Sequence, residues 1–218
     1  MEVPSLSGGK YVLIFVDRYS RYIHAHILNE KSETGKIIVE HRAIIESKHN
    51  LPLKNLHTDN GGEFLDGQIV AFCRREGIEH TTTTTMTSQQ NGFAEVRFRD
   101  IQARARTMLI QAGLPKQLWD YAVQCAVFCM NRAVSASSNT TPFKLWNGYE
   151  PDVSEMKVFG SVCYVHVPTR VRSSEKAGNS RKKRQKLDVR AIRGIFVGYA
   201  ETKHAYKVLD SLTACDLR

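Results

Sequence analysis

Three carboxylates lie where a folded chain would present them at the ends of secondary structure. Asp17 ends the apolar run Tyr11–Val16, and Asp59 follows the short run Lys54–His57. Glu95 opens an amphipathic segment, and 35 residues separate it from Asp59. Carboxylate oxygens are the ligands that Mg²⁺ and Mn²⁺ prefer, and two such ions about 3.5–4 Å apart assist phosphodiester chemistry. These carboxylates are therefore candidate ligands of a two-metal site.

Each carboxylate also has an ordinary structural explanation. Asp17 fits a hairpin corner, Asp59 fits an Asx-type turn, and Glu95 fits the first turn of a helix, where the helix dipole favours an acid. Glu63 and Asp66 are the nearest other acids, and both are expected at the start of a helix. The joint spacing, more than any one residue, favours the metal site.

The elements that would position these residues follow from hydrophobic periodicity. Tyr11–Val16 is too short for a helix and rich in β-branched and aromatic residues, so we expect a central strand, with Tyr22–Leu28 returning as its hairpin partner. Helices are expected over 33–48, over 63–76 with Gly77 at its end, from 91 to Gly113, and over 116–134. Further strands are expected over 54–57, from Ile78, over 158–167 and over 192–199.

Composition indicates a globular protein. The chain has 218 residues, of which 42% are apolar and 24% charged. No run of 18 apolar residues and no charged-then-apolar leader is present, so we expect no membrane span and no secretory signal. The five cysteines form no CxxC pair and indicate reduced thiols of an intracellular protein.

The net charge of +9 is concentrated in one segment. Between Arg170 and Arg193 there are ten Lys or Arg and two acids, so this segment carries +8 and the rest of the chain +1. Such a segment is typical of a polyanion partner, most often nucleic acid, with an acidic protein surface as the other option. The run Arg181–Lys186 is interpretable as a solvated disordered loop, a nuclear import signal or a DNA-backbone contact.

The stretches around the three carboxylates resemble the catalytic core of retroelement integrases with the D,D-35-E signature. They read FVDRYSR at 15–21, HTDNGGEF at 57–64 and QQNGFAE at 89–95. Three later stretches resemble the copia type in particular: TPFKLW at 141–146, KVFG at 157–160 and GIFVGY at 194–199. The resemblance extends from Lys10 to Asp210 and indicates a fragment of a polyprotein.

The resemblance implies an α/β fold with a ribonuclease-H-like mixed sheet flanked by helices. The catalytic core is expected over 8–135, followed by a connector over 136–152. A small C-terminal β module is expected over 153–210, interrupted by a basic disordered loop at 170–190.

The resemblance also implies DNA integration by a metal-dependent polynucleotidyl transferase with Mg²⁺ or Mn²⁺ in a two-metal site. Such an enzyme trims the 3′ ends of element DNA and joins them to target DNA. Asp17, Asp59 and Glu95 would be both the catalytic residues and the metal ligands. We expect DNA as the partner, a homo-multimer, no membrane association, and a nuclear location with a cytoplasmic particle stage. The residues expected to bind nucleic acid are Asn91, Arg97, Arg99, Arg181, Lys182, Lys183 and Arg184.

Two other functions stay open. The family usually has prolines before the Gln-Gln-Asn-Gly stretch, where this chain has threonine, methionine and serine at 84–88. Loss of prolines should loosen that loop, so one alternative is an inactive retrotransposon relic that only binds nucleic acid through its basic loop. Ribonuclease activity on hybrids is the second alternative, and the 35-residue spacing argues against it.

Overall fold

The computed structural model describes residues 3–64, 67–82, 88–134, 139–166, 191–200 and 205–210, and only the backbone of 88–91. Its strands are β1 (Tyr11–Val16), β2 (Ile23–Leu28), β3 (Asn55–Thr58), β4 (Glu79–Thr82), β5 (Val162–His166), β6 (Ala191–Tyr199) and β7 (Tyr206–Asp210). Its α-helices are α1 (Thr34–His49), α2 (Gly67–Arg75), α3 (Ser88–Ala112), α4 (Trp119–Arg132) and α5 (Pro142–Asn147). Short 3-10 helices at Lys31–Glu33 and Lys116–Leu118 precede α1 and α4. None of the helices in these ranges is long and apolar enough to cross a membrane.

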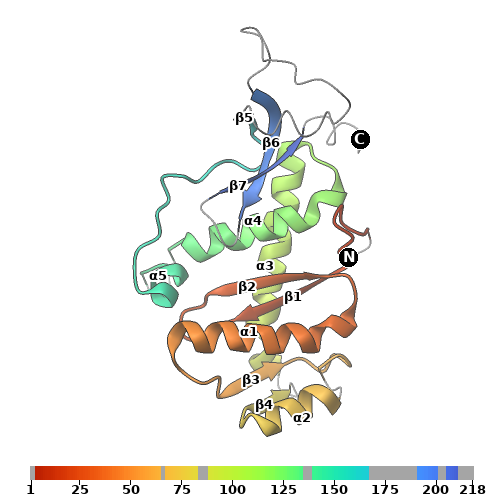
Figure 1. The fold of residues 1–218 in the computed structure, drawn as a ribbon, viewed down its shortest axis with the longest axis vertical. Helices are drawn as coiled ribbons and strands as arrows, with labels where there is room; N and C mark the ends of the chain where they lie inside the picture. Colours follow the sequence, from red (N-terminus) through yellow and green to blue (C-terminus); the bar gives the residue numbers. More distant parts are fainter. Residues whose placement is uncertain are drawn as a thin grey trace, which may run out of the picture.

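The antiparallel hairpin of β1 and β2 lies between two layers of helices (Figure 1). Because side chains of a strand alternate between its faces, β1 serves both layers. Val12, Ile14 and Val16 pack on the cluster that contains α3 and α4, whereas Phe15 packs on the cluster beneath α1 and α2. The hairpin thus packs against two separate hydrophobic clusters.

Helix α4 is joined to the hairpin by side-chain amides as well as by apolar packing. The buried Asn131 accepts a hydrogen bond from the Ile23 N–H at 2.9 Å and donates one to the Ile23 carbonyl at 2.8 Å. Gln124 donates to the Ala25 carbonyl at 3.0 Å. An unpaired strand edge must find partners for its backbone groups. Here α4 provides those partners along β2.

Strands β3 and β4 form a parallel pair that carries Asp59 at its end. The second cluster covers this pair from the side of α1 and α2; its buried members are Ile38, Ile69, Phe72, Cys73 and Ile78. Gly77 ends the α2 segment with a φ of 67°, the left-handed conformation that glycine adopts without strain. The lower part of Figure 1 shows β3, β4 and α2 together below the hairpin.

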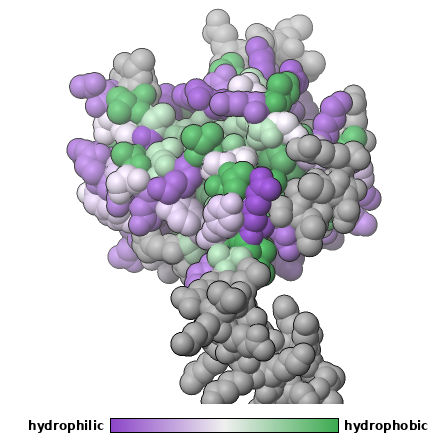
Figure 2. Space-filling view, turned by 90° about the horizontal axis from the view of Figure 1, so that it is seen from above, coloured by the Kyte–Doolittle hydropathy of each residue, from purple (hydrophilic) through white to green (hydrophobic). Residues whose placement is uncertain are grey.

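The three C-terminal strands form an antiparallel sheet in the order β5-β6-β7. Its buried Phe196 and Val197 join the α3–α4 cluster, so this small module packs on α4 (Figure 1). Several of its side chains remain open to solvent, such as Tyr164, which is 72% exposed. On the face seen in Figure 2, hydrophobic and hydrophilic residues are interspersed where grey atoms do not cover them. The α/β fold with a small C-terminal strand module is confirmed.

Several details differ from the expectations. Among the described residues the expected mixed sheet is divided, with β1 paired to β2 in one two-stranded sheet and β3 paired to β4 in another. Helix α2 begins at Gly67 instead of 63, and α3 begins at Ser88 instead of 91. The stretch expected to be a connector contains helix α5. Thr141 caps the N-terminus of this helix by accepting a hydrogen bond from the Lys144 N–H at 3.1 Å. That capping residue and the following proline were visible in the sequence.

A cluster of histidines lies between β2 and α1. The His41 ring stacks on Phe15 with centroids 4.0 Å apart, and the His24 ring meets His41 edge-on at 4.7 Å. Burial, with smaller contributions from His41, His26, Lys48 and His49, lowers the pKa of His24 to about 3. Burial and the neighbouring His26 lower the pKa of His41 to about 4. The native protein therefore holds both rings neutral.

We expect the protein to lose stability as pH falls below about 6.5. Between that value and the native pKa values of about 3 and 4, the unfolded chain binds protons that the folded chain does not. Each histidine should then lower the free energy of unfolding by about 1.4 kcal/mol per pH unit. Urea unfolding at pH 7.5, 6.5 and 5.5 measures this slope. His41→Phe keeps the aromatic stacking and should flatten it, whereas exposed His166→Asn should not; equal slopes would contradict the assignment.

Candidate functional site

Asp59 follows the end of β3, where cross-strand contacts fix the backbone. The preceding residue, Thr58, is buried and shares a hydrogen bond of 2.9 Å with the His80 ring of β4. His57 and Thr81 share a second one of 2.9 Å. The Asp59 side chain itself is exposed, and its Oδ1 accepts from the Gly61 N–H at 3.0 Å. This is the Asx-type turn expected from the sequence, and it leaves carboxylate oxygen available to a cation.

Glu63 lies beside Asp59 in the same turn. A Cβ atom at Gly61 would lie 3.0 Å from Asp59 Oδ1 and 2.9 Å from Glu63 Oε2, so both carboxylates border the space that glycine leaves open. The Glu63 Oε1 forms an ion pair of 3.1 Å with Lys31 Nζ. A hydrogen bond from its own backbone N–H and this ammonium keep the pKa of Glu63 below its usual value. Glu63 is thus a turn residue adjoining Asp59 rather than a helix-start acid.

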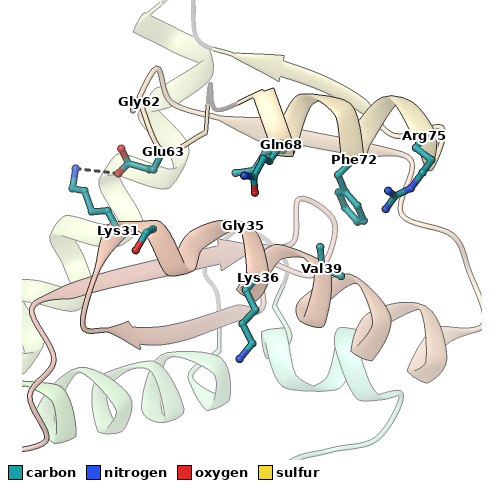
Figure 3. A pocket seen from close by; sticks show the side chains of 11 residues that line it. Lys31, Gly35, Lys36, Val39, Gly62, Glu63, Gln68, Phe72 and Arg75 are labelled. Atoms are coloured by element: carbon teal, nitrogen blue, oxygen red, sulfur yellow. Dashed lines mark ion pairs between the residues drawn. The ribbon is translucent and has the colours of Figure 1, made fainter.

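A cavity of about 810 Å³ opens between α1 and α2, next to this turn (Figure 3). Gly35, Ile69 and Phe72 supply apolar lining, while Lys36 and Arg75 bring positive charge. The Lys31–Glu63 ion pair stands at one end of it (Figure 3). None of the three predicted catalytic carboxylates lines this cavity. The cavity borders the Asp59 turn through Gly62 and Glu63.

Asp17 is placed at the first corner of the β1–β2 hairpin, as expected. Its Oδ2 accepts two short hydrogen bonds from Ser20, one from the N–H at 2.6 Å and one from the hydroxyl at 2.7 Å. Ser20 is buried, and the Asp17 carbonyl accepts from the Arg21 N–H at 2.9 Å. These bonds give Asp17 a structural task in the turn.

Glu95 lies near the start of α3 with its side chain exposed. Arg99 follows one helical turn later and is exposed as well. Arg97 lies between these two residues in sequence, and its guanidinium is 5.5 Å from the ring centroid of Phe93 and 3.8 Å from the Asp100 carboxylate. The beginning of α3 therefore presents one predicted ligand together with cationic side chains.

Within the described ranges, no group of three or more His, Cys, Asp or Glu residues is close enough to hold a metal ion. The strands that end at Asp17 and Asp59 belong to different two-stranded sheets. Both hydrogen bonds from Ser20 go to Asp17 Oδ2, so Oδ1 of that carboxylate keeps its acceptor capacity. Carboxylates are the right donors for a hard divalent cation, and the assignment of Asp17, Asp59 and Glu95 as metal ligands stays a prediction.

The remaining predicted binding residues fall outside what the structure describes. For Asn91 only the backbone, within α3, is described. The loop at 170–190, with Arg181, Lys182, Lys183 and Arg184, lies outside the described residues. Their roles stay predictions.

Two protein families match parts of this chain. The integrase core domain family matches residues 1–88, which include Asp17 and Asp59 and end before Glu95. The retroviral polymerase SH3-like domain family matches residues 161–214, the region of β5, β6 and β7. The order of the two matches agrees with a core followed by a small β module, while the boundaries at 135 and 153 stay predictions.

Curated relatives match almost the entire chain. The retrovirus-related Pol polyprotein from transposon TNT 1-94 of Nicotiana tabacum is 35% identical over 211 residues, which is 96% of this chain. The corresponding polyprotein from transposon RE2 of Arabidopsis thaliana is 30% identical over 95% of this chain. The chain spans only 15% and 13% of the lengths of these two relatives.

One solved structure supports the fold over most of the chain. A chain from the cryo-EM structure of the simian T-cell lymphotropic virus intasome, in complex with a PP2A regulatory subunit, superposes with a TM-score of 0.51. The sequence identity is 18%, and the match covers 90% of this chain and 68% of that one. At this identity the likeness shows the fold.

Replacing Asp17 tests its structural task. Asp17→Ala removes two hydrogen bonds to a carboxylate and leaves the buried Ser20 hydroxyl without this acceptor. It should lower the free energy of unfolding by about 1–3 kcal/mol in urea titrations. Asp59→Ala is the matched control, since the Asp59 side chain is exposed and accepts a hydrogen bond from the Gly61 backbone N–H, and it should cost less. Equal losses for the two variants would contradict the assignment of Asp17 to the turn.

Proposed function

We propose that this chain is the integrase segment of a copia-type retroelement polyprotein, because residues 1–88 match the integrase core domain family and the chain is similar to the Pol polyproteins of plant transposons. The observation that carries this proposal is the relationship over 96% of the chain, with Asp59 held at the end of β3. The proposed activity is polynucleotidyl transfer, with cleavage of element DNA and joining to target DNA. The proposed partner is DNA, with the chain acting as a homo-multimer.

The proposed reaction has two phosphodiester steps. In the first, water attacks the phosphorus near the 3′ end and the terminal nucleotides leave. In the second, the freed 3′-hydroxyl attacks a target phosphodiester, so that one P–O bond forms as another breaks. A divalent cation would supply charge neutralisation at the phosphorus. Asp17, Asp59 and Glu95 are the proposed ligands and catalytic residues, because all three are carboxylates at or near the ends of elements.

The cationic residues near the start of α3 are proposed to hold the DNA. Arg97 and Arg99 follow the exposed Glu95 on α3 and would contact phosphates near the reacting end. Asn91 is proposed as a further contact. The basic loop, with Arg181, Lys182, Lys183 and Arg184, would bind the DNA backbone without reading sequence. Nuclear action after a cytoplasmic particle stage completes the proposal.

A second function is favoured by one specific observation. The described residues form no three-carboxylate group, and Asp17 is engaged in its turn. A relic that binds nucleic acid through its basic loop and performs no chemistry needs no such group. Separating activity from binding distinguishes these two functions.

Asp59→Asn and Glu95→Gln should each lower the joining of labelled element-end DNA in the presence of Mn²⁺ by at least about 100-fold. A readout independent of activity is the melting temperature, which Mn²⁺ should raise in the wild type and not in these variants. Glu63→Gln is the control, since Glu63 pairs with Lys31, and should retain both responses. If the wild type binds DNA yet neither trims nor joins it, the enzyme proposal fails and the binding relic remains.

Deleting 178–188 should weaken DNA binding and reduce its dependence on salt. The segment contains Arg181, Lys182, Lys183, Arg184 and Lys186. Each lost phosphate contact makes the log–log salt slope shallower by about 0.9, so a reduction of roughly two to four is expected by fluorescence anisotropy between 50 and 200 mM salt. Replacing the same segment with glycine and serine separates charge from loop length. An unchanged slope in both variants would remove the loop from DNA binding.

A further inference from the structure

Arg21 has a backbone conformation that residues other than glycine rarely adopt. Its φ is 64°, in the left-handed region, at the end of the β1–β2 turn. That position in a hairpin usually belongs to glycine or asparagine, and another residue there costs about 1 kcal/mol. The Arg21 N–H to Asp17 carbonyl bond of 2.9 Å and the two Asp17–Ser20 bonds hold the turn in this form. An observed outlier of this kind is a reason to look for a function.

In this conformation the Arg21 side chain reaches the start of α3. Its guanidinium carbon lies 4.2 Å from the ring centroid of Phe93, which stands two residues before Glu95. The Arg97 guanidinium lies 5.5 Å from the same centroid. One aromatic ring near the start of α3 thus contacts two guanidinium groups.

These two cations are poorly neutralised by the protein. Arg21 forms no ion pair with a carboxylate of the described residues, and Arg97 has only the long 3.8 Å contact to Asp100. Cation–π contacts compensate only in part, since an exposed one contributes about 0.5–1 kcal/mol. Like charges repel, and an anion that binds either guanidinium group reduces that repulsion. The Phe93 ring therefore contacts two cations that are available to bind an anion.

The geometry points to Arg21 as a DNA-binding residue that, together with Arg97, contacts backbone phosphate at the start of α3. This inference rests on the proposed function, which supplies DNA as the anion, and adds a residue from the hairpin turn to it. Planar guanidinium groups bind phosphate oxygens through paired N–H donors, so each of them binds phosphate by geometry as well as by charge. The Phe93 ring keeps both groups oriented before DNA arrives.

Arg21→Gly separates this role from a structural one. Glycine adopts a φ of 64° without strain, so the variant should melt at the same temperature as the wild type or higher. Its affinity for a labelled DNA duplex should nevertheless fall about tenfold, the effect of losing one charged hydrogen-bonding group. Its salt slope should become shallower by about 0.9. Arg21→Asn, which also tolerates this conformation, should behave in the same way and serves if the glycine variant does not fold.

Two further variants complete the test. Arg18→Ala is the matched control, because Arg18 is an exposed cation of the same turn, and it should change affinity and salt slope much less. Arg21→Lys keeps the charge and should retain the wild-type slope with weaker binding. Equal effects of Arg21→Gly and Arg18→Ala would overturn the inference while leaving DNA integration in place. A wild type that neither binds nor joins DNA would instead overturn the proposed function.

Discussion

The structure depends first on how the open edge of the β1–β2 hairpin is satisfied. Asn131 accepts a hydrogen bond from the Ile23 N–H and donates one to the Ile23 carbonyl, and Gln124 donates to the next outward carbonyl, that of Ala25. A side-chain amide offers a donor and an acceptor in one plane, so it can replace a neighbouring strand. Because Asn131 is buried, its loss would leave backbone groups unpaired inside the core. The orientation of α4, and of the β5–β7 module packed on it, follows from this contact.

Local signals in the sequence were sufficient for most elements. The run Tyr11–Val16 is β1 as expected, since its length and β-branched content exclude a helix. Gly77 and Gly113 end their helical segments with φ of 67° and 61° because only glycine adopts this conformation freely. Helix α5 was missed even though Thr141, Pro142 and Gly148 are its start and stop signals. The stretch is polar on average, and for that reason we expected a connector there despite these signals.

Long-range and side-chain features were beyond a reading of the sequence. Spacing indicated that Asp17 and Asp59 end strands, but not that these strands belong to different sheets. Spacing also does not show which groups donate hydrogen bonds to a carboxylate. Here the Ser20 hydroxyl, three residues away, donates to Asp17. The proximity of Glu63 to Asp59 likewise arises from a turn whose helix begins later than periodicity indicates. The strain at Arg21 is visible only in the backbone.

The two hydrophobic clusters have a consequence for cooperativity. Asp59 belongs to the part of the chain built on Ile38, Ile69 and Phe72, whereas the helix that bears Glu95 is anchored by Ile101 and Leu109 in the other cluster. Parts with separate cores are able to open as separate foldons. Strand β1 packs against both clusters, with Phe15 contacting one and Ile14 the other. The distance between Asp59 and Glu95 therefore depends on how the two clusters pack against β1.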